Sequence, residues 1–97
     1  MRYSVVLSPE AIQDLRRLKP SHRSEVKQAI ETHLRHAPRK ESKSRIKRLR
    51  GIQRPEYRLR VGEVRVFYDV SGSSVEILAI IPKSKAAAWL QSIEESQ

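Results

Sequence analysis

The chain has 97 residues, a formal net charge of +9 and no cysteine. This length predicts one small domain over residues 1–97 with a single modest core. The lack of cysteine excludes disulfides and thiolate chemistry. No apolar run approaches the roughly 20 residues that a membrane-spanning helix needs, and the N-terminus turns polar too early for a signal peptide. We therefore expect a cytoplasmic protein that makes no membrane contact.

The positive charge is concentrated in one part of the chain. Residues 35–60 hold 11 of the 20 Lys and Arg residues but only 2 of the 11 acidic ones, so this segment carries the whole net charge of +9. A concentrated field of one sign attracts polyanions and speeds their encounter with a protein. No basic amphipathic helix with bulky apolar anchors accompanies the charge, which argues against a membrane surface. The composition therefore favours nucleic-acid contact over an ordinary solvated face.

The N-terminal third predicts one strand and two helices. Residues 2–7 alternate in hydrophobicity and are rich in β-branched and aromatic types, which is typical of a strand. Ser8 and Pro9 form a helix start, with an N-cap followed by proline at the first helical position. Apolar residues three and four apart predict helices over residues 9–18 and 21–36. The break between them is short, so we expect a tight antiparallel helical hairpin.

The rest of the chain predicts a small sheet and a last helix. Residues 37–44 form a polar loop. Residues 45–51 contain two apolar anchors, which fit either a helical turn or an extended segment. A β-hairpin at 57–68, an apolar strand at 75–81 and a helix at 83–96 follow. The order β-α-α-β-β-β-α predicts an α+β fold. In this fold the helical hairpin covers one face of a small twisted antiparallel sheet and leaves the other face open.

The hairpin carries the most informative pattern. Gly62-Glu63 suits a type II′ turn, because a glycine at the first central position accepts a positive φ. Strand alternation then defines a core face, made of Tyr57, Leu59, Val61, Val64, Val66 and Tyr68. The opposite face carries Arg58, Arg60, Arg65 and Phe67. Two arginines directly opposite each other cost up to about 1 kcal/mol, so we expect an anion there, with Phe67 either stacking on a base or filling a gap beneath the last helix.

The histidines give little indication of catalysis. His33 lies on the apolar stripe of the second helix, and no acid or nucleophile is placed near it by the sequence. We therefore interpret it as an ordinary half-buried histidine rather than a general base. His22 and His36 lie at helix ends, and the three residues lack the spacing of metal ligands. We expect no metal and no cofactor.

Three stretches form a signature that resembles a known family. They are Leu49-Arg50-Gly51, Tyr57-Arg58-Leu59-Arg60 and Arg65-Val66-Phe67-Tyr68, followed by an apolar strand and Lys83-Ser84-Lys85 on the closing helix. The pattern resembles the RelE/ParE superfamily of bacterial toxins. The short helical hairpin and the basic segment are more similar to the RelE branch, ribosome-dependent mRNA endonucleases. The gyrase-poisoning ParE branch usually has a longer helical hairpin.

The resemblance implies a RelE or microbial-RNase-like fold and metal-free cleavage of translated mRNA through the substrate 2′-hydroxyl, with contacts to 16S ribosomal RNA. It also implies a cognate antitoxin, with operator DNA contacted only through the toxin–antitoxin complex. The catalytic positions carried over are Arg58, Arg60, Arg65, Lys83 and Trp89. Arginines replace two family lysines at Arg58 and Arg60, and Trp89 replaces a family tyrosine. The RNA-binding positions that we expect are Lys43, Arg45, Lys47, Arg48, Arg50, Arg54, Phe67 and Lys85.

The proton chemistry is left open by these residues. Arginine stays protonated in proteins and is a poor general base, so the proton acceptor is Lys83, Lys85, Glu56, Glu41, a distant histidine or no protein group at all. Two other functions therefore remain in view. One is a ParE-like toxin that inhibits gyrase, and the other is a catalytically weak toxin homologue that acts mainly in a repressor complex with its antitoxin.

Overall fold

Five strands, three α-helices and one π-helical turn make up residues 2–96, the part of the chain that the computed structural model describes. Their order is β1 (Ser4–Leu7), α1 (Pro9–Arg17), α2 (Pro20–Ala29), the π turn η1 (Ile30–Leu34), β2 (Ile46–Arg48), β3 (Tyr57–Val61), β4 (Val64–Ser71), β5 (Ser74–Pro82) and α3 (Lys83–Ser96). The predicted order of elements is confirmed. The segment with two apolar anchors is extended and adds the short strand β2.

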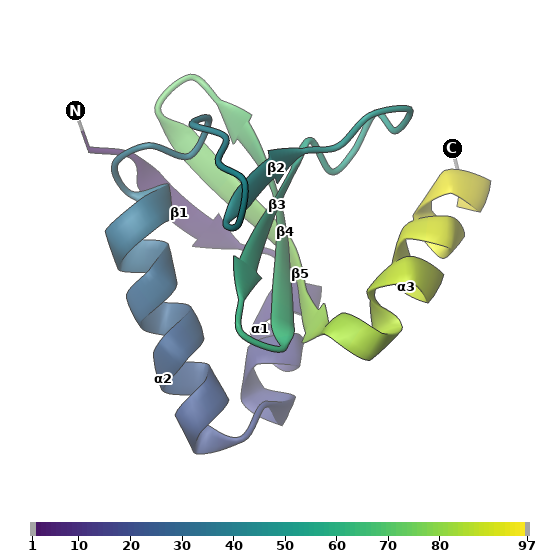
Figure 1. The fold of residues 1–97 in the computed structure, drawn as a ribbon, viewed down its shortest axis with the longest axis horizontal. Helices are drawn as coiled ribbons and strands as arrows, with labels where there is room; N and C mark the ends of the chain where they lie inside the picture. The colour runs from purple at the N-terminus through teal and green to yellow at the C-terminus, as the bar shows by residue number, and fades with distance from the viewer. Residues whose placement is uncertain (1, 97) are drawn as a thin grey trace.

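The strands form one mixed sheet in the order β1-β5-β4-β3-β2. β2, β3, β4 and β5 pair antiparallel with their neighbours, whereas β1 runs parallel to β5 (Figure 1). The prediction of a purely antiparallel sheet is therefore wrong at the β1 edge. Alternation in the sequence assigns side chains to the two faces of a strand, but it does not give the direction of that strand relative to its neighbour. β1 pairs with β5, the last strand of the meander, instead of a strand next to it in the sequence.

α1 and α2 pack on one face of the sheet and enclose the core (Figure 1). As predicted, Ser8 caps α1, and its hydroxyl accepts a hydrogen bond from the Ala11 N–H at 3.1 Å. Arg23 of α2 donates to three backbone carbonyls at the end of α1. These bonds satisfy acceptors that a helix end leaves open, and so they fix the angle between the two helices.

β3 and β4 pair in the predicted register, with Arg60 opposite Arg65 and Tyr57 opposite Tyr68. Gly62 has a φ of +55°, the positive value that the turn requires. Tyr57 and Tyr68 are buried on the core face, as predicted, and their rings stack with centroids 5.5 Å apart. The Tyr68 hydroxyl donates to the Pro38 carbonyl at 2.7 Å, which ties the polar loop to the core.

α3 lies on the opposite face of the sheet, against β4 and β5, and stands apart from the sheet along much of its length (Figure 1). None of its described side chains is fully buried. Trp89 forms its main anchor by stacking on Phe67, with ring centroids 4.8 Å apart. No helix within residues 2–96 is long and apolar enough to cross a lipid bilayer.

Candidate nucleic-acid interface

Three arginines gather on the sheet face that α1 and α2 leave uncovered. Arg58 and Arg60 come from β3, and Arg65 comes from β4 directly opposite Arg60. The pKa of Arg65 is lowered, first by burial and then by the charges of Arg58 and Arg60. The guanidinium groups of Arg58 and Arg60 are thus close enough to repel that of Arg65, and we call the three residues the arginine cluster.

Two members of the arginine cluster are partly removed from solvent. Arg65 is 6% exposed, and its Nη1 donates to the carbonyls of Gly62 at 2.8 Å and Val64 at 3.0 Å. Arg65 therefore braces the hairpin turn as well as contributing charge. The Nε of Arg58 is buried and has no hydrogen-bond partner among the described residues. A buried donor without an acceptor costs about 1–3 kcal/mol, and an anion bound at the cluster would remove that cost.

Lys83 and Glu63 lie at the same end of the sheet. The Lys83 N–H donates to the Glu63 carbonyl at 2.7 Å, which places the start of α3 beside the hairpin turn. The charge of the Glu63 carboxylate favours a higher pKa of Arg65, but burial and the other two arginines lower that pKa by more. Glu63 is not among the functional residues predicted from the sequence. Its position in the predicted turn, between Arg60 and Arg65, was the signal that could have identified it.

Phe67 does not present its ring for stacking on a base. It is fully buried beneath α3, where it stacks on Trp89 at an interplanar angle of 21°. The prediction that Phe67 binds RNA is therefore wrong in this arrangement, and the alternative that it fills the gap beneath the last helix is confirmed. Trp89 is half-buried, so part of its indole remains open to a ligand.

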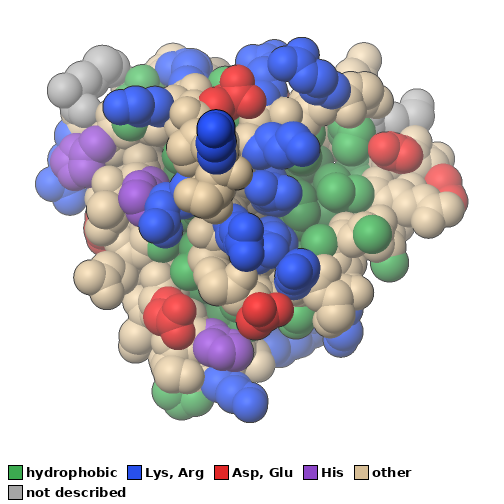
Figure 2. Space-filling model, in the orientation of Figure 1, with side chains coloured by type: hydrophobic (Ala, Val, Ile, Leu, Met, Phe, Trp, Pro, Cys, Tyr) green, Lys and Arg blue, Asp and Glu red, His purple; other side chains and the backbone are tan. Residues whose placement is uncertain are grey.

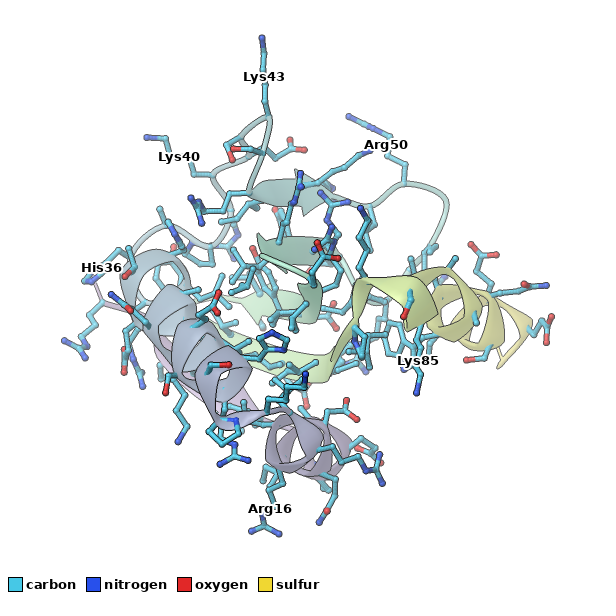
Figure 3. All side chains as sticks on the ribbon, turned by 60° about the horizontal axis from the view of Figure 1, so that its bottom comes forward. Arg16, His36, Lys40, Lys43, Arg50 and Lys85 are labelled. Atoms are coloured by element: carbon cyan, nitrogen blue, oxygen red, sulfur yellow. The ribbon has the colours of Figure 1, made fainter. Side chains whose placement is uncertain are left out.

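The basic segment extends the positive surface beyond the cluster. Lys47 of β2 pairs with Arg58 of β3, so its exposed side chain adjoins the arginine cluster. Lys43 projects from the tip of the loop before β2, and Arg50 projects from the loop after it (Figure 3). Figure 2, in which the β2 edge of the sheet is nearest the viewer, shows Lys and Arg side chains gathered over the centre and top of this side of the molecule. The concentration of charge in the sequence thus becomes a concentration in space.

Of the predicted RNA-binding residues, Arg48 is engaged in another contact and Lys85 lies apart from the basic loop. Arg48 lies over the Tyr57 ring, 5.7 Å from its centroid, and donates to the Tyr57 hydroxyl at 3.4 Å. Lys85 projects from α3 on the side away from Lys43 and Arg50 (Figure 3). The structure therefore separates Lys85 from the basic loop.

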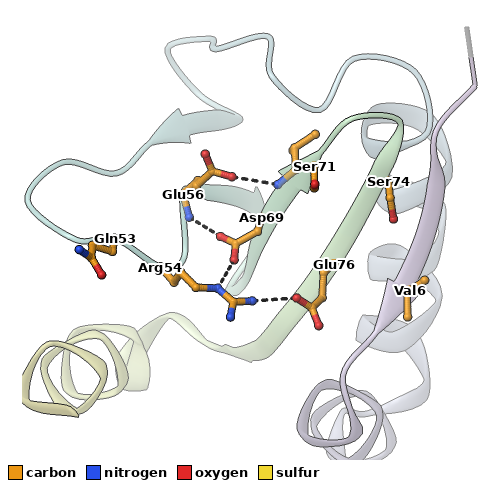
Figure 4. Close-up of a pocket in the computed structure, with 9 residues that line it drawn as sticks. Val6, Gln53, Arg54, Glu56, Asp69, Ser71, Ser74 and Glu76 are labelled. Carbon is orange, nitrogen blue, oxygen red and sulfur yellow. Dashed lines mark hydrogen bonds and ion pairs between the residues drawn. The ribbon is translucent and has the colours of Figure 1, made fainter. Parts of the chain in front are cut away.

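Arg54 belongs to an ion-pair network at the other end of the open face. It donates to Asp69 and, at 2.7 Å, to Glu76 (Figure 4). The hydrogen bond and charge of Asp69 are the main cause that raises the pKa of Arg54. The network lines a cleft of about 570 Å³. Two carboxylates cancel the charge of Arg54, so it holds its loop to the sheet and adds little attraction for a phosphate.

Comparison with known proteins assigns the family. Residues 5–87 match the family model of the ParE toxin of type II toxin–antitoxin systems, parDE. The chain belongs to this toxin family. It is a toxin of a type II toxin–antitoxin system, within the RelE/ParE superfamily. No curated protein sequence matches the toxin.

Solved structures show the same fold. The archaeal RelE–RelB complex from Pyrococcus horikoshii OT3 contains a chain that is 25% identical, with 88% of the toxin and 99% of that chain covered at a TM-score of 0.71. A free-state mutant of the E. coli toxin RelE is 21% identical, with 98% of each chain covered at a TM-score of 0.72. The RelBE2 toxin–antitoxin complex from Mycobacterium tuberculosis is 23% identical, with 84% of the toxin and 99% of that chain covered at a TM-score of 0.69. The toxin therefore has the RelE fold.

Proposed function

We propose that the toxin is an endoribonuclease that cleaves mRNA on the translating ribosome through the 2′-hydroxyl of the substrate. The observation that carries the proposal is the arginine cluster, three guanidinium groups on one open sheet face with the Arg58 Nε buried and unpaired within the described chain. Such a cluster has no structural merit by itself, because like charges opposite each other weaken a sheet. It suits a phosphate whose negative charge grows during the reaction.

The cluster would act by stabilising the pentacovalent phosphate. Arginine presents a planar fork of donors that matches phosphate oxygens, and Arg58, Arg60 and Arg65 approach from two adjacent strands. Lys83 begins α3 next to the hairpin turn and would add a further cation. Removal of one such contact costs on the order of 3 kcal/mol of barrier, about a hundredfold in rate.

The proton acceptor would lie at the hairpin end of the cluster. Glu56 accepts a hydrogen bond from the Val70 N–H at 3.1 Å, and Glu41 accepts one from the Arg48 N–H at 2.9 Å. Both carboxylates are thus occupied in holding backbone. Among the described residues, the side chains of Lys83 and Glu63 hold no backbone group, and both residues lie at the hairpin turn. Alignment of the mRNA by the ribosome would supply further rate, because correct positioning alone removes a large part of a barrier.

Inhibition of DNA gyrase is the second candidate, and the ParE description of the matching family favours it. The helical pair is short, with 9 residues in α1 and 10 in α2 followed by the 5 of η1, and this favours the RNA function instead. A third candidate is a weak catalyst that acts mainly in repression, which the stacking of Trp89 on Phe67 favours.

Under all three we propose a cognate antitoxin as partner, because two of the solved relatives are complexes of toxin and antitoxin. Operator DNA would be contacted through that complex.

Induced expression in cells separates the candidates. The ribonuclease function predicts growth arrest with transcripts cut within their translated regions, and loss of both effects in Arg65→Ala and in Lys83→Ala. Growth arrest with intact transcripts and altered plasmid supercoiling would identify gyrase inhibition instead. Absence of arrest, with antitoxin and operator binding retained, would identify the repressor role. Arg16→Ala is a matched control, because this exposed side chain projects from α1 on the opposite side of the molecule from the basic loop (Figure 3).

A further inference from the structure

A second polar groove lies on the helix side of the sheet, near the edge strand β2. Two hollows of about 280 and 400 Å³ meet there, and they share Thr32, His33 and Arg45. The first is bordered by α2 and the end of β3, and the second by the loop that leads from η1 to β2. No member of the arginine cluster lines either hollow. We call the shared space the His33 groove.

The π turn η1 forms one wall of the His33 groove. The Arg35 N–H donates to the Ile30 carbonyl at 3.2 Å, five residues back, where an α-helix would step back four. This step widens the helix at its end, and such π turns occur frequently at functional positions. His33 is half-buried there, between the core and the groove, in agreement with the prediction from its place on the apolar stripe.

The groove offers donors and positive charge at one end. Its polar lining at the loop end consists of Thr32, His33, Lys40, Ser42, Ser44 and Arg45. The Ser42 Oγ accepts hydrogen bonds from the Arg45 and Ile46 N–H groups, so its own hydrogen is available to a ligand. The side chains of Lys40 and Arg45 are exposed and have no hydrogen-bond partner among residues 2–96. Two unpaired cations surrounded by hydroxyl donors match a ligand that only accepts hydrogen bonds, such as a phosphodiester.

We propose that the His33 groove binds a phosphate of a second RNA segment, beside the segment held by the arginine cluster. The two faces adjoin at the β2 edge. Arg45 directly precedes β2, and Lys47 within β2 pairs with Arg58 of the cluster, so the positive surface continues around this edge. The inference rests on the proposed RNA function for the identity of the ligand, but it concerns binding and requires no cleavage.

His33 provides a direct report on the groove. Burial, and then the charge of Arg45, lower its pKa. The charged groups around it are Glu25 from α2 and Lys40 and Arg45 from the loop side. A phosphate between His33 and Arg45 would raise the pKa of His33, because a nearby negative charge favours the imidazolium form. The binding of RNA should then strengthen as the pH falls.

The experiment is an NMR titration of the three histidine side chains of the full chain, with and without a short 2′-O-methyl RNA that cannot be cleaved. The proposal predicts that RNA raises the pKa of His33 more than those of His22 and His36, which report the general effect of a bound polyanion. Arg45→Gln should remove the additional rise at His33. It should also lower the slope of log affinity against log salt by about 0.7, the loss of one single-strand phosphate contact. Arg16→Gln should change neither quantity.

A rise at His33 no larger than at the two control histidines would overturn the proposal, as would an unchanged salt slope in Arg45→Gln. If a poly-glutamate peptide raised the pKa of His33 and RNA did not, the groove would belong to an acidic protein partner and the RNA assignment would be wrong. Arg60→Gln separates this test from the proposed function. If Arg60→Gln lowers the slope of log affinity against log salt and Arg45→Gln does not, only the groove proposal is refuted. If neither variant lowers this slope, RNA binding as a whole is refuted.

Discussion

Replacement of Arg60 by threonine is expected to make the toxin more stable and less active. Arg60 lies opposite Arg65 and contributes to lowering the pKa of Arg65. Its own side chain is exposed, with no hydrogen-bond partner among the described residues. Removal of one of two opposed like charges in a sheet is worth about 0.2–1 kcal/mol, and threonine is well suited to a strand. For a domain of this size the Tm should rise by up to about 8 °C.

The activity should change in the opposite direction. Loss of one phosphate contact is expected to slow cleavage of ribosome-bound mRNA about a hundredfold, from a barrier increase of about 3 kcal/mol. The assays are thermal unfolding followed by circular dichroism and single-turnover cleavage on programmed ribosomes. The gain in Tm should shrink at high salt, because salt screens exposed charges. Arg60→Lys is the matched control, since it keeps the charge and the repulsion and should leave the Tm near that of the wild type.

A fall in Tm for Arg60→Thr combined with unchanged cleavage would refute this reasoning. It would show that Arg60 supports the sheet and takes no part in phosphate binding. A rise in Tm of equal size in Arg60→Lys would also contradict it, because the effect would then have a cause other than charge.

Three further predictions concern other parts of the fold. Tyr68→Phe should lower the free energy of unfolding by about 1–3 kcal/mol in urea denaturation, because it leaves the Pro38 carbonyl without its buried donor; a change near zero would be contrary to this. Trp89→Ala should increase hydrogen exchange along α3 while β4 stays protected, since the stack on Phe67 is lost; equal protection of α3 in both proteins would argue against it. The pKa of His33 in the folded chain is lowered from the ordinary histidine value of 6.5, so the unfolded chain binds more protons than the folded chain as the pH falls through that value. Stability should therefore fall as the pH drops through the ordinary histidine pKa of 6.5, and it should fall less in His33→Gln if His33 is the cause.

Local chemistry explains which parts of the fold were predictable. The turn at Gly62-Glu63 sets the register of β3 and β4, and alternation then assigns every side chain of the hairpin to a face. The start of α1 followed from Ser8 and Pro9, whose capping roles depend on immediate neighbours. The arginine cluster was predictable for the same reason, since it needs only the register of one hairpin.

Long-range pairing explains what the sequence left undetermined. The direction of β1 depends on its pairing with β5, about 70 residues away, and no local pattern encodes it. Arg54 was predicted to bind RNA because it lies in the basic segment, but Asp69 of β4 and Glu76 of β5 neutralise it. Phe67 shares the parity of the arginines and is nevertheless buried, because α3 returns over that part of the face. Charge and parity thus give the face of a residue but not its partner.

The central claim is that the arginine cluster stabilises a phosphate during RNA cleavage, and Arg58 tests it most directly because its buried Nε has no acceptor in the described chain. The measurement is the single-turnover rate of mRNA cleavage at saturating ribosome concentration for Arg58→Met, which keeps an apolar stem in place of the arginine. We expect a rate about a hundredfold below that of the wild type, with the folded state at least as stable. A rate equal to that of the wild type would contradict it.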